Sequence, residues 1–407
     1  MEALHDTPVV FLRGARQTGK TTLARTFCSE GGPRSRIYVS MDSITTLAAA
    51  EADPVGFVRG FGGPVVIDEA QRAPGIMLAI KDEVDRERTP GRFFLTGSAD
   101  VLALPRVADS LAGRMELLTL YPLSQGEISG ASEDFIDRAF DPGFAFGSTE
   151  QDLSREALFA AICRGGYPEA VSRKRPERRG AWFDSYAATL VERDVRDISN
   201  IHDKSSMIKL ISLMAARSAT LFNQSELSRS SGIAMSTLSR YISVLEALFL
   251  VWFLPAWSSN LGKRLVKSPK IHFVDSGFAS HLCGADETRL RNDHTAVGRL
   301  VESFVAGEIL KQSSWTRHPV RMFHYRSQNG DEIDLLLEDR AGRVVALEIK
   351  MAETITGRDT RGMAGLRDEI GENFVSGIVL HPGREAISLG DRLLALPIGA
   401  IFDGARQ

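Results

Sequence analysis

The sequence predicts an α/β protein built from more than one domain. The chain has 407 residues, whereas a single domain usually takes roughly 150, so two or three domains are expected. Short apolar runs alternate with helix-like segments over residues 9–98, a pattern typical of a parallel sheet. Further strand-like runs within residues 332–350 indicate a second sheet near the C-terminus.

The composition is that of an ordinary globular protein. Hydrophobic residues make up 43% of the chain and charged residues 25%, so extensive disorder is not expected. The net charge is −3, and nucleic-acid binding would therefore need a local basic surface. Cys28, Cys163 and Cys283 are far apart in sequence, which argues against a disulfide framework or a cysteine-based zinc site. Because no signal-peptide pattern or membrane-length apolar run is found, we expect a cytoplasmic protein without a membrane partner.

The first expected strand leads into a phosphate-binding loop. The apolar run 9–12 precedes a complete GxxxxGK[ST] match, and a helix is expected to follow it. Gly14 and Gly19 let the backbone wrap a phosphate chain, so that amide N–H groups face the anion. Lys20 would contact the β- and γ-phosphates of ATP, and the Thr21 hydroxyl would ligate Mg²⁺. The nucleotide-binding residues expected in this segment are Gly14, Ala15, Arg16, Gln17, Thr18, Gly19, Lys20, Thr21 and Thr22.

Two more strands are expected to carry polar side chains to the same place. The next buried-type run ends in Asp68 and Glu69. Asp68 would hold the Mg²⁺ shell, and Glu69 would orient and polarise the attacking water. The third run ends near Thr96 and Ser98, one of which is expected to sense the γ-phosphate. Parallel strands bring their carboxyl ends to one edge of the sheet, where a ligand binds.

Four segments of the first 124 residues resemble a known family. In order they are GARQTGKTTLAR, VVIDEAQRAP, FFLTGSAD and SLAGRMELLTLYPLS. They are similar to the AAA-type ATPases of many bacteria and archaea that carry a C-terminal domain of unknown function. The resemblance implies that Arg114 is an arginine-finger candidate, within one chain or across a homo-oligomer interface. A surface salt-bridge arginine is the alternative. One departure is Ala15, where relatives usually have proline.

We expect four regions along the chain. Residues 1–127 would form the P-loop ATPase core, and residues 128–215 a linker and helical lid. Residues 216–268 read as a winged helix-turn-helix, and residues 269–407 as a nuclease-like α/β domain. The expected fold class is thus α/β, with an AAA-type core, a lid, a winged-helix module and a C-terminal PD-(D/E)XK nuclease-like domain.

The winged-helix expectation rests on two helices and a basic segment. Ser225 would cap the first helix, Gly232 would make the turn, and the second helix would span residues 234–248. The outward face of that second helix is small and polar, with Arg240 as its one cation. A basic wing is expected from Lys263, Arg264, Lys267 and Lys270. DNA contact and a packing role both remain open, because few cations are available to neutralise phosphates.

The C-terminal region suggests a second site. In a strand, alternate residues share a face, so Glu348 and Lys350 point the same way. Asp334 on a neighbouring strand and Glu302 on a helix would join them around one Mg²⁺ or Mn²⁺ ion. This constellation resembles the PD-(D/E)XK nuclease superfamily. The resemblance implies that Asp334 takes the aspartate place, Glu348 the acid place and Lys350 the place of the catalytic lysine.

The expected function is Mg²⁺-dependent hydrolysis of ATP to ADP and phosphate, coupled to modules that act on or bind DNA. Lys20, Glu69, Arg114 and Lys350 are the expected catalytic residues. Two rivals stay open. One is a nucleotide-gated DNA- or protein-binding switch without nuclease activity, and the other is a nuclease that ATP regulates.

Overall fold

The chain forms two compact units in the computed structural model. The first unit comprises Met1–Pro122 and Val244–Leu250, and the second comprises Leu123–Ser243 and Val251–Gln407. The segment expected as linker and lid thus falls within the second unit. The structure describes residues 2–28, 36–98, 111–141, 153–194, 204–260, 262, 264, 267–327, 329–352 and 354–404.

A five-stranded, fully parallel sheet forms the centre of the first unit. Its strand order is β2-β3-β4-β1-β5. The strands are β1 (Val9–Arg13), β2 (Ile37–Ser40), β3 (Val65–Asp68), β4 (Phe93–Gly97) and β5 (Met115–Thr119). The expected strands before the loop, before Glu69 and before Ser98 are confirmed as β1, β3 and β4. Strands β2 and β5 at the two sheet edges were not predicted.

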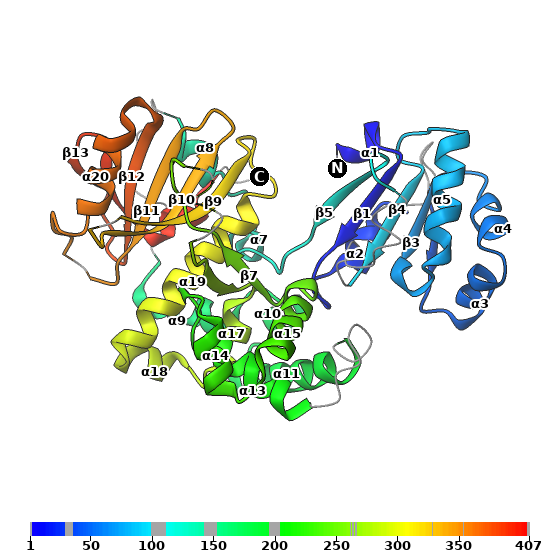
Figure 1. Cartoon of the computed structure of the whole chain (residues 1–407), viewed down its shortest axis with the longest axis horizontal. Coiled ribbons are helices and arrows are strands. Elements are labelled where there is room, and N and C mark those ends of the chain that lie inside the picture. Colours follow the sequence, from blue (N-terminus) through cyan, green and yellow to red (C-terminus); the bar gives the residue numbers. More distant parts are fainter. Residues whose placement is uncertain are drawn as a thin grey trace. The chain divides into compact units, whose positions relative to one another are not determined.

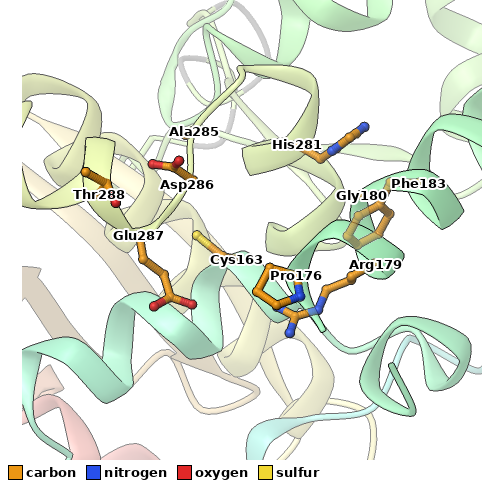
Figure 2. A pocket seen from close by; sticks show the side chains of 10 residues that line it. All are labelled: Cys163, Pro176, Arg179, Gly180, Phe183, His281, Ala285, Asp286, Glu287 and Thr288. Carbon is orange, nitrogen blue, oxygen red and sulfur yellow. The ribbon is translucent and has the colours of Figure 1, made fainter. Parts of the chain in front are cut away.

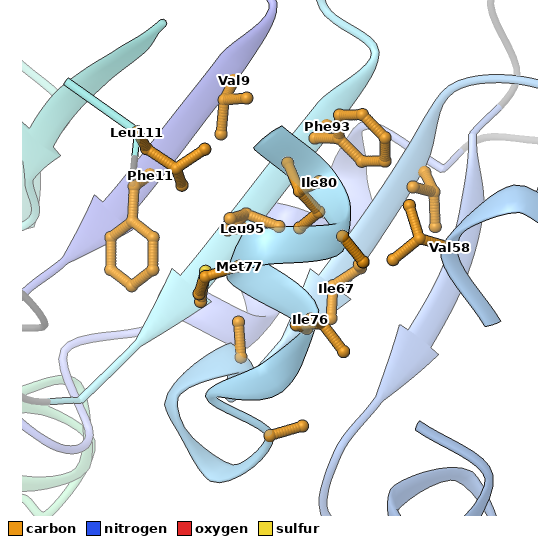
Figure 3. Close-up of a cluster of buried hydrophobic side chains, with 14 of the residues drawn as sticks. Val9, Phe11, Val58, Ile67, Ile76, Met77, Ile80, Phe93, Leu95 and Leu111 are labelled. Carbon is orange, nitrogen blue, oxygen red and sulfur yellow. The ribbon is translucent and has the colours of Figure 1, made fainter. Parts of the chain in front are cut away.

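Helices cover both faces of this sheet because its strands are apolar on both sides. Phe11 of β1 and Leu95 of β4 lie in a buried cluster with Met77 and Ile80 of α5, as Figure 3 shows. Val10, the neighbour of Phe11, belongs to the cluster on the opposite face. The helical elements are α1 (Ala3–Asp6), α2 (Lys20–Thr26), α3 (Ile44–Ala52), α4 (Pro54–Arg59), the 3₁₀ turn η1 (Ala70–Arg72) and α5 (Gly75–Arg86).

The second unit contains a six-stranded mixed sheet of order β13-β14-β12-β11-β10-β9 (Figure 1). Strands β11, β12 and β14 run parallel to one another, while β9, β10 and β13 are antiparallel to their neighbours. The strands are β9 (Val320–Arg326), β10 (Glu332–Asp339), β11 (Val344–Ile349), β12 (Phe374–His381), β13 (Ile387–Gly390) and β14 (Leu393–Pro397). The helices α19 (His294–Gln312) and α20 (Arg361–Ile370) contact β11 and β12, respectively.

A small sheet and three helices occupy the middle of the chain. The sheet order is β6-β8-β7, with β8 paired antiparallel to both neighbours. In chain order the elements are α13 (Lys204–Ala215), β6 (Thr220–Leu221), α14 (Gln224–Ser231), α15 (Met235–Ala247), β7 (Val251–Leu254) and β8 (Lys270–Phe273). Strand β8 therefore completes this sheet, although it lies beyond the expected boundary at residue 268.

The two expected middle helices form, with one correction at their start. Asn223, not Ser225, caps α14, because its side chain accepts a hydrogen bond from the Glu226 N–H. Gly232 ends α14 with φ +77°, a left-handed conformation that favours glycine, as expected for the turn. The apolar residues predicted for this second helix are all buried, although α15 ends at Ala247, one residue before the last of them: Leu238, Tyr241, Ile242, Leu245 and Leu248.

The remaining helical elements of the second unit are short, apart from α11. They are α7 (Gln125–Ser129), α8 (Phe135–Ala139), α9 (Arg155–Arg164), α10 (Pro168–Val171), α11 (Pro176–Thr189), a π-helix (Leu190–Asp194), α17 (Ser276–Leu282), α18 (Glu287–Asn292) and the 3₁₀ turns η4 (Gly371–Asn373) and η5 (Ile398–Phe402). Among the described residues, no helix has both the length and the apolar character that a membrane crossing requires.

Candidate functional site

The phosphate-binding loop lies between the end of β1 and the start of α2. Two glycines permit its path. A Cβ on Gly14 would lie 2.2 Å from the Leu120 carbonyl oxygen, so no larger residue fits there. Gly19 has φ +97° and caps α2 with a left-handed backbone. The loop therefore turns sharply enough to present the N-terminus of α2 at the carboxyl edge of the sheet.

Lys20 is the first residue of α2, and its ammonium lies inside the curve of the loop. Its Nζ donates hydrogen bonds to the carbonyl oxygens of Gly14, at 3.0 Å, and of Ala15, at 2.6 Å. Thr18 Oγ1 donates to the same Ala15 oxygen at 3.0 Å. Only 5% of Lys20 is exposed, so burial makes its charge effective at short range. A phosphate group in this curve would meet a preorganised cation.

The Asp68 carboxylate at the end of β3 is the centre of a hydrogen-bond network. Thr21 Oγ1 donates to its Oδ2 at 3.0 Å, and the Tyr38 hydroxyl donates to the same oxygen at 2.7 Å. Thr96 Oγ1 donates to Oδ1. The structure thus joins Thr21 with Asp68 as the sequence predicts, and their hard oxygen donors suit Mg²⁺. Tyr38 was missed because it lies on the unpredicted strand β2.

Glu69 follows Asp68 with an unusual backbone. Its φ is +55°, and its amide donates to Thr96 Oγ1 at 3.2 Å. Gln71 Nε2 donates both to the Glu69 carboxylate and, at 3.2 Å, to Ser98 Oγ. Ser98 Oγ in turn donates to Glu69 Oε2 at 3.4 Å. The left-handed turn and the two partners fix where this carboxylate points, and Gln71 is a site residue that the sequence reasoning did not identify.

Arg114 lies at the other end of the sheet. Its carbonyl oxygen accepts a hydrogen bond from the Val9 N–H, and β1 and β5 are parallel with Val9 opposite Met115. The five residues of β1, at about 3.3 Å each, span about 16 Å between this edge and the loop. The guanidinium instead forms a bidentate ion pair with Asp85 of α5, at 2.5 and 3.0 Å. Its hydrogen bond holds the pKa of Asp85 below the usual value. This arrangement does not bring Arg114 to the phosphate loop of its own chain.

The predicted residues of the C-terminal site lie together, with one additional residue. Lys350 Nζ donates to Glu348 Oε1 at 2.6 Å, as their shared strand face predicts. Asp334 Oδ2 accepts the Ile349 N–H at 3.0 Å. The unpredicted member is Lys270 of β8, whose Nζ lies 2.6 Å from Glu302 Oε1 and 3.3 Å from Asp334 Oδ1. We call Lys270, Glu302, Asp334, Glu348 and Lys350 the acid cluster.

Burial dominates the electrostatics of the acid cluster. Burial, followed by the Asp334 charge, raises the pKa of Glu302 to about 8, although Lys270 opposes this. The same two causes raise the pKa of Glu348 to about 7. Among the described residues, no group of three His, Cys, Asp or Glu side chains is arranged to hold a metal ion. The metal site at Glu302, Asp334 and Glu348 stays a prediction, and the cation that lies beside the first two acids in the structure is the ammonium of Lys270.

The expected basic wing is corrected. Arg264 forms a nearly buried bidentate pair with Glu338, at 2.7 and 2.8 Å. Lys270 is buried in the acid cluster. Neither residue is therefore available to bind phosphate groups of a nucleic acid, because carboxylates of the chain already neutralise both charges. Lys267 is exposed, and Lys263 lies outside the described residues.

A pocket of about 310 Å³ lies elsewhere in the second unit, beside α11 and α18 (Figure 2). Two of its polar lining residues serve the local structure. His281 Nε2 pairs with Asp184 Oδ1 at 2.7 Å, and Asp286 caps α18 by accepting the Arg289 N–H. Burial raises the pKa of the Cys163 thiol to about 12, so this thiol is no nucleophile at neutral pH. The pocket offers no reaction comparable to that of the phosphate loop.

Comparisons with known proteins agree with the first unit's site. The AAA domain profile matches residues 6–129. Two domains of unknown function, DUF8612 and DUF4143, match residues 155–289 and 297–401. An uncharacterized protein of Mycobacterium bovis and one of Mycobacterium tuberculosis are each 31% identical to this chain over 401 residues, which is 98% of the chain and 82% of each relative. The phosphate loop, its network and these matches together show that the chain belongs to the family of AAA-domain proteins that end in the DUF4143 domain.

Proposed function

We propose that this protein is a Mg²⁺-dependent ATPase that converts ATP to ADP and phosphate. The observation that carries the proposal is the meeting of two segments at one sheet edge. Lys20 and Thr21 begin α2, while Asp68 ends β3 and Glu69 follows it, and the 3.0 Å contact between Thr21 and Asp68 joins the two segments. These are the phosphate, metal and water functions that phosphoryl transfer to water requires.

Each side chain then has one task. Lys20 would exchange its two carbonyl contacts for β- and γ-phosphate oxygens. Thr21 and Asp68 would hold Mg²⁺, which neutralises charge on the phosphates when bound. Glu69 would accept a hydrogen bond from the attacking water and orient it. Ser98 contacts the Glu69 carboxylate and is the candidate that would report the γ-phosphate to it.

Two variants test these tasks separately. Lys20→Ala should abolish ATP binding, because it removes the phosphate cation. Glu69→Gln should keep binding but lower phosphate release by on the order of 10²–10⁴, since the water loses its carboxylate partner. Glu51→Gln, an exposed acid on α3, is the matched control. Equal turnover by wild type and Glu69→Gln would remove Glu69 from the mechanism.

For the second unit we propose a binding role without nuclease activity. The element order α13-β6-α14-α15-β7-β8 supports a winged helix, and the exposed Arg240 and Lys267 are its candidate nucleic-acid contacts. The ammonium of Lys270 beside Glu302 and Asp334 argues against metal-dependent cleavage. This favours a nucleotide-gated switch over a nuclease that ATP regulates.

DNA binding by the switch is tested by its salt dependence. With Arg240 and Lys267 as the two phosphate contacts, the slope of log affinity against log salt should be about −2. The double charge reversal Arg240→Glu and Lys267→Glu should abolish binding to duplex DNA, and Arg88→Glu in the first unit is the control. Binding that survives the double reversal would assign the helices a packing or protein-binding role instead.

A further inference from the structure

The acid cluster has the chemistry of a cation site. Three carboxylates are brought together from a helix and two strands: Glu302 from α19, Asp334 from β10 and Glu348 from β11. Each is at least half withdrawn from water, and Glu348 is only 7% exposed. Carboxylates that share a desolvated site repel one another unless a cation lies between them.

The position of that cation is taken by the chain itself. Lys270 is 6% exposed, and its Nζ lies 2.6 Å from Glu302 and 3.3 Å from Asp334. The two carboxylates therefore share one ammonium. Lys350 provides the second positive charge, at 2.6 Å from Glu348 Oε1. Five ionisable groups thus carry three negative and two positive charges when all are ionised.

Strand pairing holds Lys270 in this place. It lies on β8, the central strand of the small sheet, opposite Leu221 on one side and Leu254 on the other. Alternate residues of β8 share a face, so Lys270 points with His272, whose ring contacts Ser303 of α19. The ammonium is therefore delivered from a rigid element and does not depend on a mobile surface side chain.

One carboxylate oxygen of the acid cluster lacks a hydrogen-bond partner among the described residues. This atom is Glu348 Oε2, which is buried. A buried carboxylate oxygen without a partner is rare and costly, and it points to a cation site that the two lysines satisfy only in part. This observation is independent of the clustering of the acids.

We propose that Lys270 is the resident cation of a divalent-metal-type site, and that it keeps Mg²⁺ and Mn²⁺ out of the acid cluster. The acids of the C-terminal domain then bind Lys270 of the small sheet β6-β8-β7. They do not serve metal-dependent catalysis. Removing the ammonium should leave Glu302 and Asp334, which now share it, without that counterion beside the Glu348 carboxylate, one oxygen of which has no partner among the described residues. A divalent cation with oxygen ligands should then bind there. This inference does not depend on the proposed ATPase activity.

The test measures Mn²⁺ binding to the full chain without nucleotide. Lys270→Met keeps the length of the side chain and removes its charge. We expect it to bind one Mn²⁺ per chain more than wild type, seen by electron paramagnetic resonance, and to gain thermal stability on addition of Mn²⁺. The double variant Lys270→Met, Asp334→Asn should lose this gain, whereas Lys270→Met, Asp68→Asn should keep it. The second control separates the new site from the nucleotide Mg²⁺ site.

Two results would overturn the proposal. One is Mn²⁺ binding by wild type that Asp334→Asn abolishes, and the other is a folded Lys270→Met chain that gains no Mn²⁺. If Lys270→Met does not fold, amine labelling read by mass spectrometry decides. Lys270 should resist labelling in wild type with or without Mn²⁺ and become labelled in Glu302→Gln. If Lys270 is labelled in wild type, or becomes labelled when Mn²⁺ is added, its ammonium does not occupy the acid cluster and the proposal is contradicted.

Discussion

The hydroxyl of Tyr38 donates a 2.7 Å hydrogen bond to Oδ2 of Asp68, from one strand to the next across the sheet. The same oxygen accepts from Thr21, so the tyrosine helps to set the direction in which the carboxylate faces the expected metal position. Burial, followed by this hydrogen bond, raises the pKa of Tyr38, and the phenol remains a donor at neutral pH. Tyr38 is therefore a positioning residue.

Tyr38→Phe should weaken the use of Mg²⁺ by the ATPase. The phenyl ring keeps the contact with the Arg25 guanidinium, at 4.8 Å, and only the hydroxyl is lost. One lost hydrogen bond of about 1 kcal/mol corresponds to a roughly fivefold loss. We expect the half-saturating Mg²⁺ concentration to rise by that factor while ATP binding without metal stays the same. An unchanged Mg²⁺ dependence would show that Asp68 needs no help from β2.

Gln71→Ala should lower kcat without changing KM for ATP. Gln71 donates to both Glu69 and Ser98, so its loss frees the carboxylate to rotate. A severalfold decrease in kcat is expected, because a misdirected carboxylate orients water less often. Steady-state phosphate release measures it, with the half-buried Gln224→Ala on α14 of the second unit as control. A rise in KM together with an unchanged kcat would place Gln71 in nucleotide binding.

Arg114→Ala should leave turnover unchanged wherever the protein is monomeric. The arginine lies at the amino edge of the sheet, paired with Asp85, and not at the phosphate loop. If it serves a neighbouring chain, activity lost by Arg114→Ala should return on mixing with Lys20→Ala, which supplies an intact arginine. Turnover as a function of protein concentration and mixing ratio distinguishes the cases. A loss of activity in dilute monomer would contradict the geometry.

Two buried histidines should lower the stability of the second unit in acid, and they act against Glu302 and Glu348, whose raised pKa values favour the folded chain as the pH falls. Burial lowers the pKa of His324 to about 4 and that of His272 to about 3. As the pH falls below about 6.5 these histidines bind protons in the unfolded chain but not in the folded chain, so their contribution to the free energy of unfolding decreases toward pH 4. Each histidine contributes a slope of up to about 1.4 kcal/mol per pH unit.

His324→Gln should reduce this acid sensitivity. Glutamine can still donate to the Ser268 carbonyl oxygen, which His324 Nε2 contacts at 3.0 Å. The measurement is urea unfolding followed by tryptophan fluorescence. This signal reports the second unit alone, because Trp182, Trp252, Trp257 and Trp315 all belong to it. If the free energy of unfolding changes with pH in the same way for variant and wild type, the pKa of His324 is the same in the folded and unfolded chains.

The sequence predicts the phosphate loop well because its chemistry is local. Lys20 and Thr21 are contiguous, and an apolar run just before Asp68 is enough to place that residue at a strand end. Tyr38 could not be found in this way, since only the strand order puts β2 beside β3. Strand order follows from packing over the whole unit, and the sequence around Tyr38 contains no pattern that indicates it.

Lys270 illustrates the same limit in the second unit. Beside other lysines it reads as a surface cation, but its partners lie 32 and 64 residues further along the chain. The clue within the sequence is its place at the start of the apolar alternation of β8, where a lysine must be paired. The acids themselves were predicted, because strand alternation fixes the side on which Glu348 and Lys350 lie.

The ion pairs that Lys270 and Arg264 form also determine where this chain can be cut into fragments or joined to another protein. Sequence comparison ends one domain at residue 289 and begins the next at residue 297. Yet Lys270 and Arg264, upstream of that border, neutralise Glu302, Asp334 and Glu338 downstream of it. A fragment cut at the border, or a chimera that joins this C-terminal half to a foreign partner, would contain Glu302 and Asp334 without Lys270, and of its described ion-pair partners Glu338 would keep only Arg321. The transferable module is the pair of domains, even though each is recognised separately.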